Sequence, residues 1–262
     1  MTSTVKTLWI EHYKINSLLV NSQGRLGLYG VLNLLQETAW IHAETLGFGM
    51  EDMEKKGLYW VLTRQTLKMK DWPSYGHKIS IETWLKPPEG AFAGREFLIK
   101  NEAGEKIGAC TTSWLALDRN TKGILHSNGL HNWNEICRKE TTGMVAEKIS
   151  VSGEYHNVAH YRVRNSDLDS NQHVNNTKYS QWILDSIPYE LHKKLVLTDY
   201  SVNFLAETHL GDEVEIDRSQ SFSSEFEEDI GVSSYRGLRF SDKKVLFTAK
   251  LAWRTLAAKS QS

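Results

Sequence analysis

Residues 28–46 read LYGVLNLLQETAWIHAETL, and this segment decides the first half of the fold. Its apolar residues recur every three or four positions, at Leu28, Val31, Leu32, Leu35, Ala39, Ala43 and Leu46. That spacing places them on one stripe of an amphipathic helix. Gly47 and Gly49 follow the stripe and predict the end of the helix.

Alternating strands follow this helix. Ile79, Ile81, Thr83 and Leu85 alternate with other residues, most of them polar. Such a period of two predicts a sheet with one buried face and one wetter face. A single amphipathic helix is best buried by wrapping the sheet around it, which predicts an α+β unit of roughly 115 residues.

The same pattern occurs twice in the chain. Val61-Leu62-Thr63 recurs as Val196-Leu197-Thr198, and residues 61–81 stay in step with residues 196–216 without a gap. Upstream, Tyr13-Lys14-Ile15 matches Tyr161-Arg162-Val163. Two matching blocks in the same order indicate an internal duplication.

The second copy has its own helix and strands. Tyr179, Trp182, Ile183 and Ile187 share the helical spacing, Asn175 or Asn176 is the expected N-cap, and Pro188 blocks continuation. Val245, Phe247, Ala249, Leu251 and Trp253 alternate as a strand. We therefore expect two units, residues 1–118 and 157–262. Residues 119–156, which are polar with short apolar islands, are expected to be an ordered linker.

Composition excludes several classes of protein. The chain has 262 residues, 31 Lys and Arg, and 32 Asp and Glu, so its net charge of -1 does not suggest a nucleic-acid binder. No apolar run exceeds about five residues, so we expect no membrane span, and residues 1–14 lack a signal-peptide pattern. Cys110 and Cys137 are the only cysteines, which excludes a disulfide framework and favours a reducing cytoplasm.

The candidate chemistry lies just before the second helix, where residues 167–176 read DLDSNQHVNN. A polar turn with an N-cap is the simpler interpretation. However, the first copy has Asn21, Gln23 and Arg25 at the positions of Asp169, Asn171 and His173. A turn alone would not require that difference. His173 would also lie at a helix start, where backbone N–H groups can stabilise an oxyanion.

Glu207 is a second candidate, at the end of the apolar strand from Val202 to Leu205, where the first copy has Trp72. A solvated glutamate at a strand end is the alternative. Hydrolysis of an acyl bond needs a group that moves protons near neutral pH, as histidine does, and a carboxylate that orients it or attacks directly. An amide such as that of Asn171 can position water or the carbonyl without changing charge.

Other chemistry has little support in the sequence. Cys110 and Cys137 fit buried structural roles. The zinc spacings CxxC and HExxH do not occur, and the spacing of Gly24, Gly27 and Gly30 matches neither common nucleotide-binding loop. We therefore expect no metal ion and no cofactor.

Residues 169–179, DSNQHVNNTKY, resemble the acyl-acyl-carrier-protein thioesterases of plants and bacteria, whose DxNxHVNNxxY stretch is intact here. The resemblance implies a double (tandem) hotdog fold, in which two antiparallel sheets each wrap around a long helix. It implies hydrolysis of fatty acyl-acyl carrier protein in fatty acid biosynthesis, with Asp169, Asn171, His173 and Glu207 as catalytic residues. Plant members often have a cysteine after that glutamate, and this chain has Thr208 there.

Further expectations follow from the resemblance. Asp169 would either act as the nucleophile or orient His173. His173 and Glu207 would activate water, and a backbone N–H near Val174 or Asn175 would face the oxyanion. The first unit would hold the acyl chain, with walls at residues 28–46, Tyr59-Trp60 and Trp84, and Trp40 and Trp182 would be core or pocket wall. Arg162, Arg164 and Lys178 would dock the acidic carrier protein or be ordinary solvated charges.

Three other functions stay open from the sequence: an acyl-coenzyme A thioesterase, a non-catalytic acyl-binding hotdog module, and, with less support, a hotdog dehydratase. A duplicated hotdog supplies its own pairing, so the resemblance allows a monomer or a homodimer.

Overall fold

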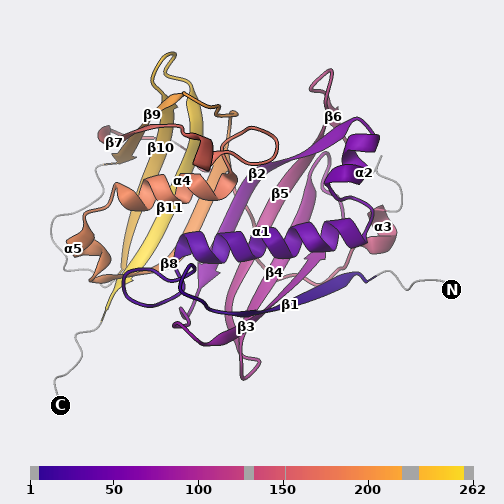
Figure 1. Ribbon diagram of the computed structural model, residues 1–262, viewed down its shortest axis with the longest axis horizontal. Helices are drawn as coiled ribbons and strands as arrows, with labels where there is room; N and C mark the ends of the chain where they lie inside the picture. The colour runs from indigo at the N-terminus through magenta and orange to yellow at the C-terminus, as the bar shows by residue number, and fades with distance from the viewer. Residues whose placement is uncertain (1–5, 127–132, 151, 220–229, 257–262) are drawn as a thin grey trace. The chain divides into compact units, whose positions relative to one another are not determined.

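The computed structural model describes residues 6–126, 133–150, 152–219 and 230–256. The chain forms two compact units, Met1–Glu147 and Lys148–Ser262. Each unit contains a long helix on an antiparallel sheet (Figure 1), as the helical stripes and the alternating strands predict.

The first unit begins with a strand, continues with a helix and then builds the rest of its sheet. Its strands pair antiparallel in the order β1-β3-β4-β5-β2, with the short β6 beside β5. The elements are β1 (Leu8–Lys14), α1 (Leu28–Thr45), α2 (Met50–Lys55), β2 (Leu58–Met69), β3 (Lys78–Leu85), β4 (Ala93–Asn101), β5 (Lys106–Asp118), β6 (Ile124–Leu125) and α3 (Trp133–Ile136).

The second unit repeats this plan. Its strands have the order β7-β9-β10-β11-β8, so each strand has a counterpart at the same place in the first sheet. The elements are β7 (Tyr155–Arg162), a 3-10 turn (Asn165–Asp167), α4 (Asn176–Asp185), α5 (Tyr189–His192), β8 (Leu195–Phe204), β9 (Glu213–Ser219), β10 (Ile230–Arg239) and β11 (Val245–Thr255).

The duplication extends to individual residues. Tyr13 pairs with Ile79 in the first unit, and Tyr161 pairs with Val214 in the second. The repeated Val-Leu-Thr segment forms a β-bulge in both copies, because the strand register skips Thr63 in β2 and Thr198 in β8. The sequence repeat therefore corresponds to a repeat in backbone geometry.

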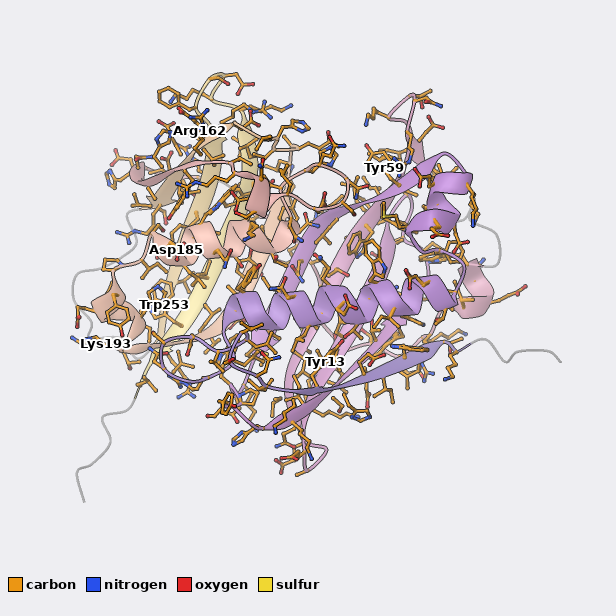
Figure 2. All side chains as sticks on the ribbon, viewed as in Figure 1. Tyr13, Tyr59, Arg162, Asp185, Lys193 and Trp253 are labelled. Atoms are coloured by element: carbon orange, nitrogen blue, oxygen red, sulfur yellow. The ribbon has the colours of Figure 1, made fainter. Side chains whose placement is uncertain are left out.

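The predicted stripe of α1 faces the core of the first unit. Val31, Leu32 and Leu35 are almost fully buried. Thr38 on the same side forms a 2.9 Å hydrogen bond with the hydroxyl of Tyr13, a residue of β1 that Figure 2 labels. The expectation that Trp40 is a core residue is wrong: it is 41% exposed, and its indole N–H donates to Glu44 one helical turn away. Its role as a pocket wall stays a prediction. Trp40 falls outside the apolar stripe, so its place on the helix does not make it a core residue.

A buried polar pair lies inside this core. Arg95 and His42 are both buried, and an Arg95 guanidinium nitrogen lies 2.9 Å from His42 Nδ1 and 3.2 Å from Thr83 Oγ1. His42 Nε2 lies 3.0 Å from the Lys6 carbonyl oxygen. Burial, and then the Arg95 charge, lower the pKa of His42 to about 3.

The described part of residues 119–147 packs with the first unit. Trp133 of α3 is buried, with ring contacts to Phe48 at 5.5 Å and to Trp60 at 6.0 Å. Downstream, Thr141 Oγ1 and the Thr142 N–H both donate to the Glu96 carboxylate. The packing of Trp133 accounts for one apolar island of this segment.

Both cysteines have the structural character expected of them. They are free thiols, and Cys110 is buried in β5 while Cys137 is half-buried. Burial raises the pKa of the Cys110 thiol to about 12 and that of Cys137 to about 11. Neither thiol is therefore an activated nucleophile.

Candidate active site

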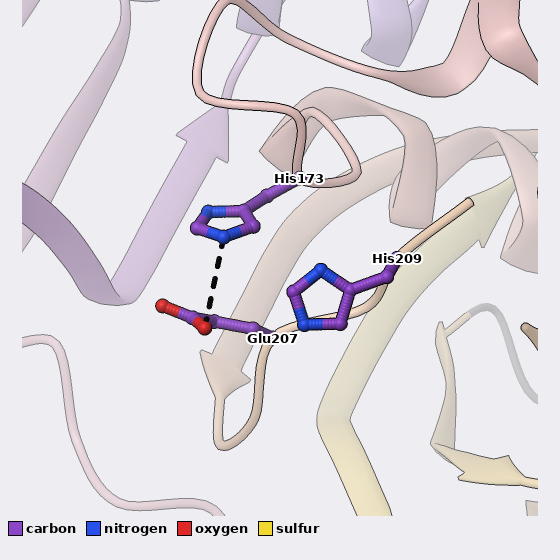
Figure 3. A group of neighbouring side chains, drawn as sticks. All are labelled: His173, Glu207 and His209. Carbon is purple, nitrogen blue, oxygen red and sulfur yellow. Dashed lines mark ion pairs between the residues drawn. The ribbon is translucent and has the colours of Figure 1, made fainter.

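Two of the predicted site residues meet in the second unit. His173 Nε2 lies 3.6 Å from Glu207 Oε2 (Figure 3). The two side chains are 27% and 39% exposed, so solvent and a substrate can reach them. A third residue, His209, completes the group, with its ring centroid 5.1 Å from that of His173 in an edge-on arrangement.

One backbone hydrogen bond explains why residues so far apart in sequence come together. The Val174 N–H donates to the Thr208 carbonyl oxygen at 3.0 Å, which ties the motif loop to the segment after β8. Thr208 is fully buried, and its side chain forms a 3.0 Å hydrogen bond with the Tyr179 hydroxyl. The last residue of the DxNxHVNNxxY motif therefore positions the chain between Glu207 and His209.

Tyr179 is itself held by aromatic packing. Its ring makes edge-on contacts with Trp182, Phe204 and Phe247 at 5.1–5.4 Å. Burial raises the pKa of the Tyr179 hydroxyl to about 12, so it remains a neutral donor. Trp182, expected as core or pocket wall, is a core residue of α4.

Arg239 of β10 holds the segment of Glu207, Thr208 and His209 from a second direction. Its guanidinium donates to the Glu207 carbonyl oxygen at 2.8 Å and to Asp212 Oδ2 at 3.3 Å. Asp212 Oδ2 also accepts a 3.0 Å hydrogen bond from the backbone N–H of His209. The backbone of residues 207–209 is thus anchored on both sides before any substrate arrives.

Asp169 shapes the loop that carries His173. Its Oδ1 accepts hydrogen bonds from the backbone N–H groups of Asn171 at 2.8 Å and of His173 at 3.2 Å. The Asp169 N–H donates to the His173 carbonyl oxygen at 2.8 Å, and Gln172 takes a left-handed conformation with φ of 64°. Asp169 therefore reaches His173 through the backbone of that residue.

The first unit builds the same loop without a carboxylate. Asn21 Oδ1 accepts the N–H groups of Gln23 at 3.0 Å and of Arg25 at 3.2 Å, and the Asn21 N–H donates to the Arg25 carbonyl at 2.7 Å. Gly24 has the left-handed conformation, with φ of 71°. Closing this loop needs an Asx oxygen and no charge, so the Asp169 carboxylate is more than the turn requires.

The start of α4 differs from one expectation. Asn175 is the N-cap, as predicted, and its side-chain oxygen accepts the Thr177 N–H at 3.0 Å. The prediction that an N–H near Val174 or Asn175 faces an oxyanion is wrong for both residues. The Val174 N–H donates to Thr208, and the Asn175 N–H donates to the Asp167 carbonyl at 2.8 Å.

The remaining predicted residues lie at the surface around the loop. Asn171, two residues after Asp169, is exposed. Arg162, at the end of β7, and Arg164 are exposed as well. Lys178 differs from these two arginines, because its side chain is only 18% exposed and its Nζ lies 3.8 Å from Asp167 Oδ1. Arg162 and Arg164 are therefore better placed than Lys178 to meet a partner.

His209 is the site residue that sequence reasoning missed. It follows Glu207 by two positions, and alternate residues of an extended chain point to the same side. The first copy has Ser74 at the equivalent position, so the comparison that singled out Asp169 and Glu207 also marks His209. One ligand atom each from His173, Glu207 and His209 lie within 4.8 Å of one another.

This arrangement is suited to acid–base chemistry. An imidazole beside a carboxylate can accept a proton from water and return it to a leaving group. The side chains arise from the motif loop and from the segment after β8, and the hydrogen bond between Tyr179 and Thr208 connects the two. The described residues include no helix long and apolar enough to cross a membrane.

Comparison with known proteins agrees with these observations. The model of the acyl-ACP thioesterase N-terminal domain matches residues 6–127, and that of the C-terminal domain matches residues 151–254. Oleoyl-acyl carrier protein thioesterase 1 of Arabidopsis thaliana is 28% identical over 72% of the chain. Palmitoyl-acyl carrier protein thioesterase of Gossypium hirsutum is 26% identical over 96% of it. The matches cover 59% and 65% of these two relatives, so the chain spans about three fifths of their length.

Solved structures show the fold. An acyl-ACP thioesterase from Bacteroides thetaiotaomicron superposes with a TM-score of 0.84 and 24% identity, covering 96% of this chain and all of that one. The 12:0-ACP thioesterase from Umbellularia californica superposes with a TM-score of 0.85 and 20% identity, covering 97% of this chain and 96% of that one. The expected tandem hotdog, an α+β fold, is confirmed. With both family models matched along most of its length, the chain belongs to the acyl-ACP thioesterase family.

Proposed function

We propose that this protein hydrolyses the thioester of fatty acyl-acyl carrier protein, releasing a free fatty acid and ending chain elongation. The observation that carries the proposal is the His173–Glu207 pair, 3.6 Å apart, beside an intact family motif. Relatives named as thioesterases or hydrolases of acyl carrier protein support the substrate class.

In the proposed reaction His173, with Glu207 beside it, takes a proton from water as the oxygen attacks the thioester carbonyl carbon. The tetrahedral intermediate collapses, the carbon–sulfur bond breaks, and the proton passes from His173 to the thiolate of the carrier arm. Asn171, exposed at the loop, positions the carbonyl or the water. Asp169 either holds the loop in its negatively charged form or attacks the carbonyl itself through Oδ2, because Oδ1 is engaged.

Isotope labelling can reveal a covalent role of Asp169. In a single turnover in ¹⁸O-water, direct attack by water places ¹⁸O in the fatty acid and leaves the Asp169 carboxyl group unlabelled. A covalent route places ¹⁸O in the Asp169 carboxyl group when water attacks the enzyme side of the acyl anhydride, and in the fatty acid when water attacks the acyl side. Label in the peptide that contains Asp169, detected by mass spectrometry, would therefore establish the covalent route.

The two halves are proposed to divide the work. Residues 157–262 carry the chemistry, residues 119–156 are the linker, and residues 1–118 hold the acyl chain. Tyr59 and Trp84, which are buried, and the partly buried Trp60 are the proposed walls, together with α1. Each methylene buried contributes about 0.8 kcal/mol, so a narrowed pocket would shift chain-length preference toward shorter acyl groups.

The acidic carrier protein is proposed to dock beside the motif loop, where Arg162 and Arg164 are exposed. Reversing both charges, as Arg162→Glu with Arg164→Glu, should raise the Michaelis constant for the carrier-bound substrate and leave that for a coenzyme A thioester unchanged. An unchanged constant for the carrier substrate would exclude this docking surface. The protein is proposed to act in the cytoplasm, as a monomer or a homodimer.

The test of the function is turnover of the same acyl group on two carriers. We expect faster hydrolysis of the acyl carrier protein thioester than of the coenzyme A thioester. A preference for coenzyme A would favour the alternative acyl-coenzyme A thioesterase, and binding of either substrate without product release would favour a non-catalytic acyl-binding module.

A further inference from the structure

The side-chain cluster of His173, Glu207 and His209 has a second chemical capacity. Two imidazoles and one carboxylate are a common ligand set for zinc and other divalent transition metals. Zinc–nitrogen and zinc–oxygen bonds of about 2.0–2.2 Å put the ligand atoms of a tetrahedral site about 3.3 Å apart. His173 Nε2 and Glu207 Oε2 are already 3.6 Å apart, and all three ligand atoms lie within 4.8 Å.

The backbone prearranges this ligand set. Thr208 points into the core, where it is fully buried, so its neighbours Glu207 and His209 project to the opposite side, toward His173 (Figure 3). The 3.0 Å bond from the Val174 N–H to the Thr208 carbonyl fixes the distance between the two ligand-bearing segments. The backbone therefore holds the three ligand atoms within 4.8 Å of one another.

We propose that His173, Glu207 and His209 bind a divalent transition metal ion, with zinc as the test ion, and that the bound ion inhibits the enzyme. The metal would occupy the imidazole lone pair and the carboxylate that otherwise activate water. Metal binding does not depend on the proposed thioesterase function, whereas the inhibition rests on that function.

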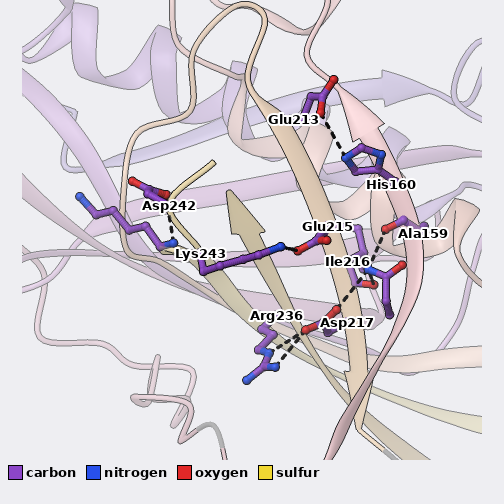
Figure 4. Close-up of polar contacts among 11 residues, drawn as sticks. Ala159, His160, Glu213, Glu215, Ile216, Asp217, Arg236, Asp242 and Lys243 are labelled. Atoms are coloured by element: carbon purple, nitrogen blue, oxygen red, sulfur yellow. Dashed lines mark hydrogen bonds and ion pairs between the residues drawn. The ribbon is translucent and has the colours of Figure 1, made fainter. Parts of the chain in front are cut away.

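A metal titration of the full-length protein tests the binding. The chain contains ten histidines, so a matched control is necessary. His209→Ser introduces the residue found at the equivalent position, Ser74, of the first copy. His160→Ser removes a histidine of the same unit that also faces a glutamate, Glu213, at 3.8 Å (Figure 4).

Calorimetry with zinc chloride, after removal of metals by a chelator, should show one ion per chain for the wild-type protein and for His160→Ser. His209→Ser should bind at least about tenfold more weakly, since even changes outside the ligand shell cost about 10–100-fold. Glu207→Gln should weaken binding as well, which provides a second variant if His209→Ser fails to fold by circular dichroism. Equal zinc affinity in wild type and both ligand variants would overturn the site.

Inhibition is measured as the loss of acyl-carrier hydrolysis relative to the zinc-free rate of each protein. Wild type and His160→Ser should lose activity at the zinc concentration that fills the site and regain it with chelator, whereas His209→Ser should need at least about tenfold more zinc. Zinc that fills the site and leaves or raises turnover would overturn the inhibitory role. If the protein hydrolyses no acyl-carrier substrate, the proposed function and the inhibition both fail, and calorimetry still decides the metal site.

Discussion

The paired loops of the two units allow the charge of Asp169 to be separated from its role in folding. Asp169→Asn keeps an Oδ1 acceptor for the N–H groups of Asn171 and His173, as Asn21 does for its own loop at 3.0 and 3.2 Å. Asp169→Ala removes both bonds. The two substitutions therefore differ in loop geometry and agree in the loss of the negative charge.

The expected magnitudes differ accordingly. Two hydrogen bonds at about 0.5–1.5 kcal/mol each make the alanine variant less stable by about 2 kcal/mol. That corresponds to a fall in the melting temperature of roughly 4–8 °C. The asparagine variant should lose less than about 1 kcal/mol. Both variants should hydrolyse acyl-acyl carrier protein about 10²–10⁴-fold more slowly, because both lack the negatively charged carboxylate that takes part in the proposed reaction.

The assay is release of the carrier thiol at saturating substrate, with the melting temperature measured on the same preparations. Asn21→Asp in the first unit is the control, since it places the same charge in a loop without the histidine and should leave turnover near that of wild type. An Asp169→Asn protein that turns over within about threefold of wild type would refute the reasoning, because it would show that Asp169 only closes the turn.

Three further substitutions test other parts of the account. Glu207→Gln should lower kcat about 10²–10⁴-fold in a thiol-release assay with the melting temperature unchanged, since the side chain is partly exposed; an unchanged kcat would exclude Glu207 from the reaction. Thr208→Val leaves the Tyr179 hydroxyl without its partner in the core, and denaturant unfolding should show a loss of about 1–3 kcal/mol; full stability would show that this bond does not hold the segment. His42, whose pKa burial and Arg95 lower to about 3, binds its proton in the unfolded chain below pH 6.5 and not in the folded one. The stability that depends on neutral His42 is therefore complete above pH 6.5 and is lost as the pH falls toward 3, by up to about 1.4 kcal/mol per pH unit. His42→Gln should reduce that slope in urea unfolding measured between pH 4 and pH 7, and an unchanged slope would exclude His42 as its source.

Periodicity and repetition made much of the fold predictable. The stripe over residues 28–46 corresponds to α1, Leu28–Thr45, and the repeated strands pair in the same order in both units. Trp40 is not a core residue because it lies off the stripe, where it is exposed and its indole N–H donates to Glu44.

The candidate site was predictable where the two copies differ. Asp169, His173 and Glu207 replace residues of other types in the first copy, and the structure brings His173 and Glu207 together. The bonds that arrange them were not predictable, because the Val174–Thr208 contact joins residues far apart in sequence. The buried pair of His42 and Arg95 was missed for the same reason, since it links α1 to β4 across the core.

The most direct measurement is the rate at which the purified protein releases fatty acid and carrier thiol from acyl-acyl carrier protein, compared between wild type and His173→Asn. We expect the two products in equal amounts from the wild-type protein and a rate at least about 10²-fold lower from the variant. Equal rates from the two proteins, or a wild-type protein that binds the acyl carrier and releases neither product, would contradict the account.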